Sequence, residues 1–441
     1  MNPVQAVDLT TPIPKRRRLR RPAARRKLPA VPTPTAARRA AALALLAAGP
    51  AAGQGAPTPA PRAPAQRDTA ARPAPWYERL SLRGYTQVRS NGLLRTNPAL
   101  ACPQCDRTYG PNGGLSLRRV RLILSGDVGD RVSLYVQPDF ASEVDGTLGV
   151  GQLRDAYADV FLDRARAVRV RLGQSKIPYG WENMQSSGNR VPFDRSDGIN
   201  SALPNERDVA ALLYWAPPAV RRRLRALVDS GLKGSGDYGV VGLGAFNGQG
   251  TNRPDANNTL HAVARVAYPF LLRGGRVVEL GVQGYRGRYV LPAALRSPGV
   301  AAPDDFLDAR VAGTAVLYPQ PFGVQAEWNV GRGPEADPAG RAVRTRPLRG
   351  GYVMAMYRAR PAGQELIPYA RVQSYRGGKK FELDARRYRV REAEVGVEWE
   401  PYPAFELTAA YAAADRRQED ATTPVNRQRG RLLRLQAQVN Y

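Results

Sequence analysis

Two stretches on either side of one long connection decide the fold of this chain: VRVRLGQSKIPYGWENMQ (residues 168–185) and LPNERDVAALLYW (residues 203–215). In the first stretch, Val168, Val170 and Leu172 alternate with Arg169 and Arg171. Alternation with a period of two places one set of side chains on each face of a β-strand. The first stretch therefore predicts a strand with one apolar face and one arginine face.

The second stretch has the same period. Val209, Ala211, Leu213 and Trp215 form one set, and the residues between them form the other. Between the two predicted strands, about thirty residues, Ser175–Glu206, contain proline, glycine and many polar side chains. A connection of that length is rare in a compact domain. Because the arginine face of the first strand borders this loop, we expect the loop to fold into a hollow barrel.

The same pattern of alternating segments runs from Leu80 to the last residue. Turns rich in Pro, Gly and Asp separate the segments, which number about sixteen. The predicted strands are Leu80–Arg89, Leu115–Ser125, Arg131–Asp139, Leu153–Leu162, Val168–Gly173, Val209–Trp215, Tyr238–Phe246, Thr259–Tyr268, Arg276–Tyr285, Asp308–Tyr318, Phe322–Val330, Gly350–Arg358, Ile367–Tyr375, Arg387–Trp399, Phe405–Tyr411 and Arg431–Tyr441.

Short and long connections take turns along the chain. The expected long loops are Asn91–Gly114, Phe140–Gln152, Ser175–Glu206, Asn247–Asn258, Arg286–Leu307, Gly331–Arg349, Arg376–Arg386 and Ala412–Gly430, and Ala216–Asp237 is the one long connection on the short side. Short turns at one end and long loops at the other are typical of outer-membrane barrels. A soluble β-sandwich also buries one face of each strand. The polar faces rich in Arg, Glu and Gln favour the barrel, as do aromatic residues at strand ends. Those expected in the interfacial girdles are Trp215, Tyr268, Tyr318, Tyr352, Trp399 and Tyr402.

The N-terminal part of the chain is typical of a targeting segment. A basic run from Lys15 to Lys27 precedes the apolar AAALALLAA of Ala40–Ala48, and small residues follow in Gly49–Ala56. A secretory signal has this order of charge, apolar core and small residues. We therefore expect residues 1–56 to be a basic extension and signal peptide, residues 57–79 a Pro/Ala-rich linker, and residues 80–441 the barrel. A disordered basic tail is the alternative for the first segment.

The formal net charge of the 441-residue chain is +28, with 66 Lys and Arg against 38 Asp and Glu. Residues 1–56 carry +10 of it, as eleven basic residues and one acid, which leaves +18. A basic balance points to an anionic partner. Basic clusters with interleaved aromatic residues and nucleic-acid-binding motifs are absent from the sequence, so we expect no nucleic acid. Small anions and the lipid of an outer membrane are the expected partners.

The two cysteines form one C-x-x-C, Cys102 and Cys105. Zinc needs four ligands, and the chain has no second such pair and a single His. Thioredoxin-type chemistry wants the pair at a helix N-terminus after a strand, whereas these residues lie in a polar loop. A disulfide between Cys102 and Cys105 that closes this loop is the favoured interpretation, because exported proteins meet an oxidising compartment.

Several arginines share the polar phase of their predicted strands: Arg119, Arg121, Arg169, Arg171, Arg265, Arg371 and Arg434. Rings of Arg and Lys suit an anion pore. The alternative is that they pair with Glu279, Glu327, Glu394 and Glu398 and merely fill the interior. The basic residues expected to line the pore and bind anions are Lys176, Arg169, Arg171, Arg119, Arg121, Arg190, Arg195 and Arg207. No cofactor and no metal is expected.

The chain resembles the phosphate-selective porins of Gram-negative outer membranes. The resemblance is carried by LGQSKIPYGWENMQSS (Leu172–Ser187), NRVPFDRSDGIN and NERD (Asn205–Asp208), with support from RRVRLILSGDVGDRVSLYVQPDF (Arg118–Phe140), LRDAYADVFL (Leu153–Leu162) and the terminal Tyr441. It implies a trimer of sixteen-stranded outer-membrane barrels. In each, the third external loop folds into the pore and basic residues select anions such as phosphate. The resemblance implies a lysine-rich loop in the phosphate-specific members, whereas Lys176 is the single lysine of this loop. This difference favours a general anion preference over strict phosphate selectivity.

Two other functions remain as alternatives. A structural barrel or adhesin with a plugged lumen would show the same strands and conduct nothing. An outer-membrane hydrolase would need a catalytic constellation, but the sequence has no G-x-S-x-G motif, and its single histidine, His261, lies in a predicted strand. We therefore expect a passive channel and no enzyme.

Overall fold

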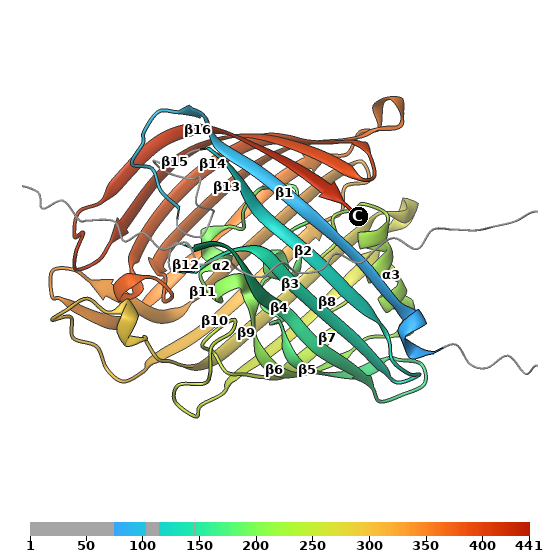
Figure 1. The fold of residues 1–441 in the computed structure, drawn as a ribbon, viewed down its shortest axis with the longest axis horizontal. Coiled ribbons are helices and arrows are strands. Elements are labelled where there is room, and N and C mark those ends of the chain that lie inside the picture. The colour runs from blue at the N-terminus through green and yellow to red at the C-terminus, as the bar shows by residue number, and fades with distance from the viewer. Residues whose placement is uncertain (1–74, 103–113, 145–146) are drawn as a thin grey trace, which may run out of the picture. The chain divides into compact units, whose positions relative to one another are not determined.

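The computed structural model describes residues 75–102, 114–144 and 147–441. Within these residues, sixteen strands form one closed antiparallel barrel in which each strand pairs with its neighbours in the chain and β16 pairs with β1 (Figure 1). The strands are β1 (Leu80–Arg95), β2 (Leu115–Asp127), β3 (Val132–Val144), β4 (Thr147–Phe161), β5 (Val168–Lys176), β6 (Arg207–Trp215), β7 (Val241–Phe246), β8 (His261–Leu271), β9 (Val277–Tyr289), β10 (Phe306–Leu317), β11 (Phe322–Asp337), β12 (Ala342–Tyr357), β13 (Glu365–Gly378), β14 (Arg387–Tyr402), β15 (Phe405–Glu419) and β16 (Arg427–Asn440).

Helices occur only in the connections of the described residues. Three are α-helices: α1 (Trp181–Met184), α2 (Asp197–Asn200) and α3 (Pro218–Asp229). The short 3-10 turns are η1 (Trp76–Arg79), η2 (Pro204–Glu206), η3 (Arg273–Gly275), η4 (Ala293–Leu295), η5 (Pro361–Gly363) and η6 (Leu383–Ala385). Within the described residues, no helix combines the length and apolar character needed to span a bilayer.

The ends of the chain close the barrel. Tyr85 lies opposite Asn440 in the register of β1 and β16, and Gly84 and Tyr441 exchange backbone hydrogen bonds of 2.6 and 3.0 Å. In lipid an unpaired backbone group costs several kcal/mol. A closed ring leaves no sheet edge, so the predicted all-β barrel of about sixteen strands is confirmed. The predicted strand beginning at Leu80 is confirmed as well.

Alternation sorts side chains between the two faces of the wall as the sequence predicts. On β5, Arg169 and Arg171 are buried inside and Leu172 is exposed outside. On β6, Val209, Leu213 and Trp215 are exposed while Tyr214 is buried. The polar phase therefore faces the lumen and the apolar phase faces outward, where lipid takes the place of a core.

Three of the expected long loops are wrong. Phe140–Gln152, Gly331–Arg349 and Ala412–Gly430 lie mostly in strands, because β3 and β4, β11 and β12, and β15 and β16 continue far beyond the predicted ends. The extensions carry polar residues on both faces. Since the barrel wall rises above the apolar band there, water replaces lipid and the alternation that marks a strand is lost.

Two of the expected girdle residues are also misplaced. Trp215, Tyr268, Trp399 and Tyr402 are exposed on the outer face, as a girdle requires. Tyr318 and Tyr352 are buried in the interior, where Tyr318 packs edge-on against Trp181 with ring centroids 6.4 Å apart. Tyr352 shares its phase with the buried Met354 and Met356 and so points inward.

The connection on the short-turn side, Ala216–Asp237, is more regular than expected. Its sequence indicates one or two helical turns, whereas α3 runs for 12 residues. Val220, Leu224 and Leu227 of α3 are buried in one cluster with Trp181 and Tyr318. Their i, i+4, i+7 spacing forms one apolar stripe. The helix therefore packs at the end of the barrel near η1 and the C-terminus (Figure 1).

Candidate pore site

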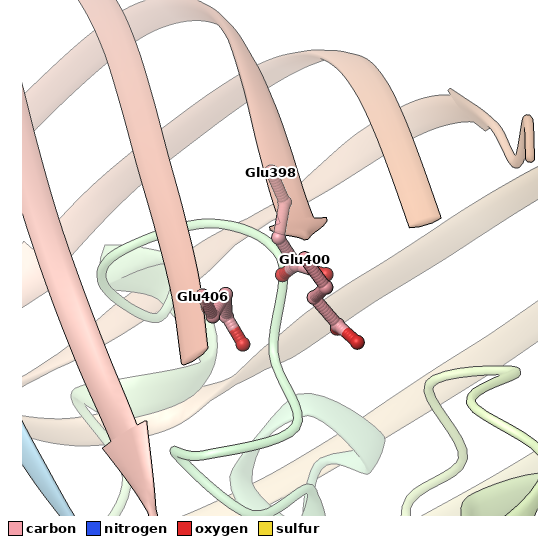
Figure 2. Close-up of side chains that lie close together, drawn as sticks. All are labelled: Glu398, Glu400 and Glu406. Carbon is pink, nitrogen blue, oxygen red and sulfur yellow. The ribbon is translucent and has the colours of Figure 1, made fainter. Parts of the chain in front are cut away.

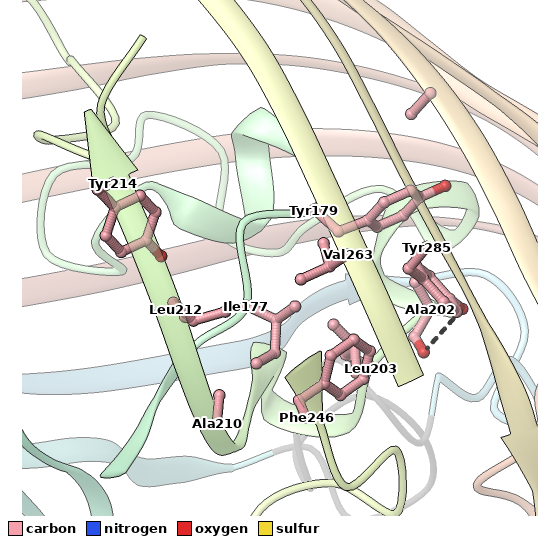
Figure 3. Packing of buried hydrophobic residues seen from close by; sticks show 11 residues of the cluster. Ile177, Tyr179, Ala202, Leu203, Ala210, Leu212, Tyr214, Phe246, Val263 and Tyr285 are labelled. Atoms are coloured by element: carbon pink, nitrogen blue, oxygen red, sulfur yellow. Dashed lines mark hydrogen bonds between the residues drawn. The ribbon is translucent and has the colours of Figure 1, made fainter. Parts of the chain in front are cut away.

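The connection between β5 and β6 lies inside the ring of strands. Ile177, Tyr179, Ala202 and Leu203 are fully buried in a cluster with Phe246 and other side chains of β6–β10 (Figure 3). Tyr179 meets Tyr285 edge-on, with centroids 4.8 Å apart. A loop with this many buried apolar side chains has its own packing surface, which fixes its start and its end against one side of the wall.

The middle of the loop reaches the opposite wall. The backbone N–H groups of Trp181 and Glu182, at the start of α1, donate to the Glu327 carboxylate of β11 at 2.5 and 2.8 Å. At α2, a Cβ on Gly198 would lie 2.7 Å from the carbonyl carbon of Gly350 and 2.8 Å from the nitrogen of Gly351. Backbone therefore lies against backbone, a separation that only glycine allows.

Ion pairs fasten the loop to the wall at two further points. The Asp194 carboxylate accepts from Arg89 of β1 at 3.0 Å and from Arg434 of β16. Burial opposes the ionisation of Asp194, but Arg89 and Arg434 outweigh it and hold its pKa well below the usual range. Asp197 pairs in the same way with Lys379 and, at 2.9 Å, with Arg416.

The root of the loop carries a second network. Glu206 accepts from Arg195 at 2.8 Å and from Arg207 at 3.1 Å, and Arg207 also donates to Asp155 at 2.8 Å. Burial raises the pKa of Glu206, but the two arginines more than offset it and bring its pKa down to about 2. Lys176 donates to the main-chain carbonyls of Met184 and Gln185 at 2.9 and 2.7 Å. These residues hold the loop in place.

Five of the eight predicted pore residues pair with carboxylates. Arg121 bonds Asp139 at 2.8 Å, and Arg171 bonds Asp159 at 2.8 Å while its guanidinium lies 3.8 Å from the Tyr157 ring centroid. The five are Arg121, Arg169, Arg171, Arg195 and Arg207. A buried charge without a partner is costly, so the interior supplies carboxylates. The partners are mainly aspartates, and of the glutamates considered from sequence, Glu279 pairs with Arg265 and Glu394 with Arg371 and Arg434.

The other three, Lys176, Arg119 and Arg190, bond to neutral oxygens among the described residues. Arg119 donates to the Gln87 amide at 2.7 Å, and Arg190 donates to the carbonyls of Pro192 and Phe193 at 2.9 and 2.6 Å. Burial and the nearby charge of Arg195 lower the pKa of Arg190 to about 9. Within the described chain, these three side chains have hydrogen bonds to neutral oxygens and no carboxylate at ion-pair distance.

A cavity of about 400 Å³ collects part of this basic surface between the loop, β1–β5 and the segment after α3. It brings together four predicted residues, Arg121, Arg171, Lys176 and Arg207, and it adds Arg83 and Arg225. Its only carboxylates are Asp155 and Asp237, and tyrosines complete the wall. Arg119, Arg169, Arg190 and Arg195 do not line it.

Sequence reasoning missed two basic residues of this cavity. Arg83 shares the inward phase of Tyr85 and Gln87 on β1, so strand alternation carries a signal for it. Arg225 of α3 carries no such signal, because its position depends on how the short-turn connection folds back toward the lumen. The residues after α3, Gly234–Asp237, complete the same wall.

Lys233, also after α3, is held by an acidic cluster. Glu398, Glu400 and Glu406 offer carboxylate oxygens within 4.8 Å of one another, an arrangement that could hold a metal ion (Figure 2). The Lys233 ammonium pairs with Glu398 and, at 3.2 Å, with Glu400. A lysine of the chain thus supplies the positive charge, and the cluster anchors the segment that follows α3 to β14 and β15.

The cysteine prediction falls partly outside the described residues. Cys102 is buried among Leu100, Ala412, Ala414 and Leu432 at the long-loop end of the barrel. Cys105 lies outside the described residues, so the disulfide between them stays a prediction. The predicted signal peptide and most of the predicted linker also lie outside them.

A closed barrel with an apolar outer face, a charged lumen and a loop that crosses the lumen defines the porin class of outer-membrane channels. The family model for phosphate-selective porin O and P matches residues 101–441, so the chain belongs to that family. It is accordingly a multi-strand outer-membrane channel and not an enzyme. A search of curated protein sequences gave no significant match.

Solved structures agree on the fold. The outer-membrane channel DcaP of Acinetobacter baumannii superposes with a TM-score of 0.53 at 14% identity, over 82% of this chain and 97% of that one. Salmonella typhi OmpF, solved in complex with daunomycin, gives 0.50 at 10% identity, over 82% and 97%. At such identities the likeness concerns the fold alone.

Proposed function

We propose that this outer-membrane channel conducts small anions, phosphate among them, past the β5–β6 loop and through the basic cavity beside it. The observation that carries the proposal is the charge of the cavity wall: six Arg and Lys side chains against two carboxylates. An anion in a narrow passage loses water, and fixed positive charges replace that hydration without a binding step too tight for release.

The arrangement also suits weak binding. Arg121, Arg171 and Arg207 each hold a carboxylate already, so a passing anion meets guanidinium groups whose charge is partly neutralised. One unit charge at about 4 Å is worth roughly 4 kcal/mol at an effective dielectric of 20. A small excess of unpaired charge is therefore enough to set selectivity.

Arg83 and Arg225 are the best residues for a test. Both are exposed to the cavity side, and neither has a carboxylate within ion-pair distance in the described part of the chain. Changing both to Glu should move the reversal potential in a salt gradient toward cations. The matched control changes Arg164 and Arg222 to Glu, two exposed residues of the short-turn end that do not line the cavity. If the wild type shows no anion preference, or both pairs shift it equally, the proposal is wrong.

The finer expectations follow the family. We propose that three copies form a trimer and that phosphate reduces chloride conductance by competing for the cavity. Single-channel recordings in chloride with added phosphate test the second point, and mass determination in detergent tests the first. A plugged barrel would conduct nothing in the same recordings.

A further inference from the structure

A second population of arginines lies on the outer face of the barrel. Cross-strand register places five of them directly opposite one another on β12–β16, and we call them the outer arginine row: Arg349, Arg376, Arg389, Arg417 and Arg427. Arg417 is half-buried and the other four are exposed. They share the phase of the outward apolar side chains and so point away from the lumen.

Rows below this one show where the lipid boundary lies. Two residues nearer the short-turn end, Arg391, Asp415 and Arg429 lie opposite one another. The next row is Val353, Val372, Ala393, Ala413 and Arg431, and the row after it is Ala355, Ala370, Val395, Tyr411 and Leu433. Each step is about 6.8 Å along the strand. Apart from Arg431, the arginines of these rows thus lie beyond the apolar side chains, toward the long-loop end.

Like charges directly opposite on a sheet are destabilising. The outer face offers few carboxylates to relieve them. Asp415 pairs with Arg427 at the row and with Arg429 below it, and Glu419 pairs with Arg387. Within the described residues, Arg349, Arg376, Arg389 and Arg417 have no carboxylate at ion-pair distance. None of these four arginines is therefore neutralised by an ion pair of its own within the described residues.

The outer surface is hollowed at the same place. One cleft of about 620 Å³ is lined by Arg349, Arg376, Arg389 and Arg417 together with Arg346 and Arg387, and by three carboxylates, Glu335, Asp337 and Glu419. A second, of about 740 Å³, is lined by Val372, Ala393 and Ala413, by Arg391, Arg429 and Arg431, and by the carboxylates Glu392 and Asp415. Small apolar side chains beside arginines fit an acyl chain that continues into a charged headgroup.

We propose that this face binds a phosphate-bearing lipid of the outer leaflet, with the headgroup phosphates on the outer arginine row and an acyl chain over Ala393 and Ala413. The long-loop end of an outer-membrane barrel faces outside, which puts the row at the level of the outer-leaflet headgroups. Arginine binds phosphate bidentately and supplies charge that a lipid phosphate complements. A role in the ion path is excluded by the outward phase of these side chains.

The test uses the full-length protein, purified in non-ionic detergent and stripped of lipid. Native mass spectrometry measures the binding of lipid A with two phosphates, of the same lipid after dephosphorylation, and of inorganic phosphate. The variant is Arg349→Gln with Arg376→Gln and Arg389→Gln. The matched control, with the same change of charge, is Arg164→Gln with Arg222→Gln and Arg273→Gln, all exposed at the short-turn end.

Phosphorylated lipid A should bind the wild type and the control equally, and it should bind the row variant on the order of a hundredfold more weakly, since each arginine at a headgroup is worth about fivefold. The dephosphorylated lipid should bind the wild type no more tightly than phosphorylated lipid A binds the row variant. Millimolar inorganic phosphate should not displace lipid A from the wild type. The conductance and reversal potential of the row variant should match the wild type, which also shows that it folds. Equal binding by variant and wild type, equal loss in the control, or a changed oligomer with unchanged lipid binding would overturn the proposal.

Discussion

Most inner arginines of this barrel differ from the outer ones in burial and in ion pairing. Inside, Arg171 and Arg434 are buried and each is held by a carboxylate. Outside, Arg376 and Arg389 lie in water or headgroup, next to other arginines, and have no such partner in the described residues. Solvent explains the difference. Burial of a charge is costly unless the charge is paired or hydrogen-bonded, whereas an exposed charge is stabilised by water and stays accessible to an external anion.

The comparison also separates two uses of positive charge. Part of the inner set holds the loop through Asp194, Asp197 and Glu206, and other members of the set line the cavity. Apart from Arg427, which pairs with Asp415, the outer row makes no ion pair within the described residues, and its like charges destabilise the sheet until an anion binds. Changes to the inner set should therefore lower stability and alter conductance, and changes to the outer row should do neither.

The largest effect should follow from Asp194→Asn, which removes the carboxylate shared by Arg89 and Arg434. Breaking a buried ion pair costs about 3–5 kcal/mol. We expect the free energy of unfolding in detergent to fall by that amount and single-channel conductance to rise and become noisier as the loop loosens. Asp130→Asn is the control, because Asp130 is exposed and lies 3.8 Å from Arg79. Equal unfolding midpoints for the two variants would refute the anchoring role of Asp194.

Acid should weaken the second anchor in a defined range. The pKa of Glu206 is held near 2, below its usual value of about 4.5, so its ion pairs stabilise the loop fully above about pH 4.5 and lose their effect as pH falls through about 2. A shift of this size corresponds to about 3 kcal/mol. The difference in unfolding free energy between wild type and Glu206→Gln should therefore be constant from pH 7 to 5 and shrink at lower pH. A difference that does not change with pH would show that the charge of Glu206 is unimportant.

A steric change should have a smaller effect. Gly198→Val puts side-chain atoms against the backbone of Gly350 and Gly351, and overpacking of this kind costs about 1–3 kcal/mol. The loop should move away from β12 and the conductance should increase. Gly313→Val is the matched control, because a Cβ at Gly313 meets nothing within 4 Å. If both valine variants conducted like the wild type, the close contact of Gly198 with the backbone of Gly350 and Gly351 would not control conductance.

The smallest effect should come from the outer row. Arg376 lies between Arg349 and Arg389, so Arg376→Gln removes two repulsions between like charges. In lipid-free detergent we expect stability to rise by a few tenths of a kcal/mol, with conductance unchanged. Denaturant titration with and without lipid A measures this, and the sign should reverse when lipid is present. A loss of stability without lipid would mean that Arg376 has a structural role inside the protein.

Some ion pairs lie within reach of sequence reasoning and others do not. Arg171 and Asp159 are 12 residues apart on neighbouring strands joined by a short turn, so the hairpin register predicts their contact. Arg434 and Asp194 are separated by 240 residues, and only the path of the loop across the lumen brings them together. Carboxylate partners on the loop, such as that of Arg434, therefore cannot be assigned from the sequence alone.

The sequence by itself determined the strand number, the alternation of faces and the family, because a period of two and the spacing of turns are local properties of the chain. Only the tertiary structure decided the rest. It set which arginines meet carboxylates, where α3 lies, and that five arginines from five strands form one row. These features depend on the register of the strands around the closed ring and on the position of the boundary between water and lipid. The sequence of a single strand determines neither of them.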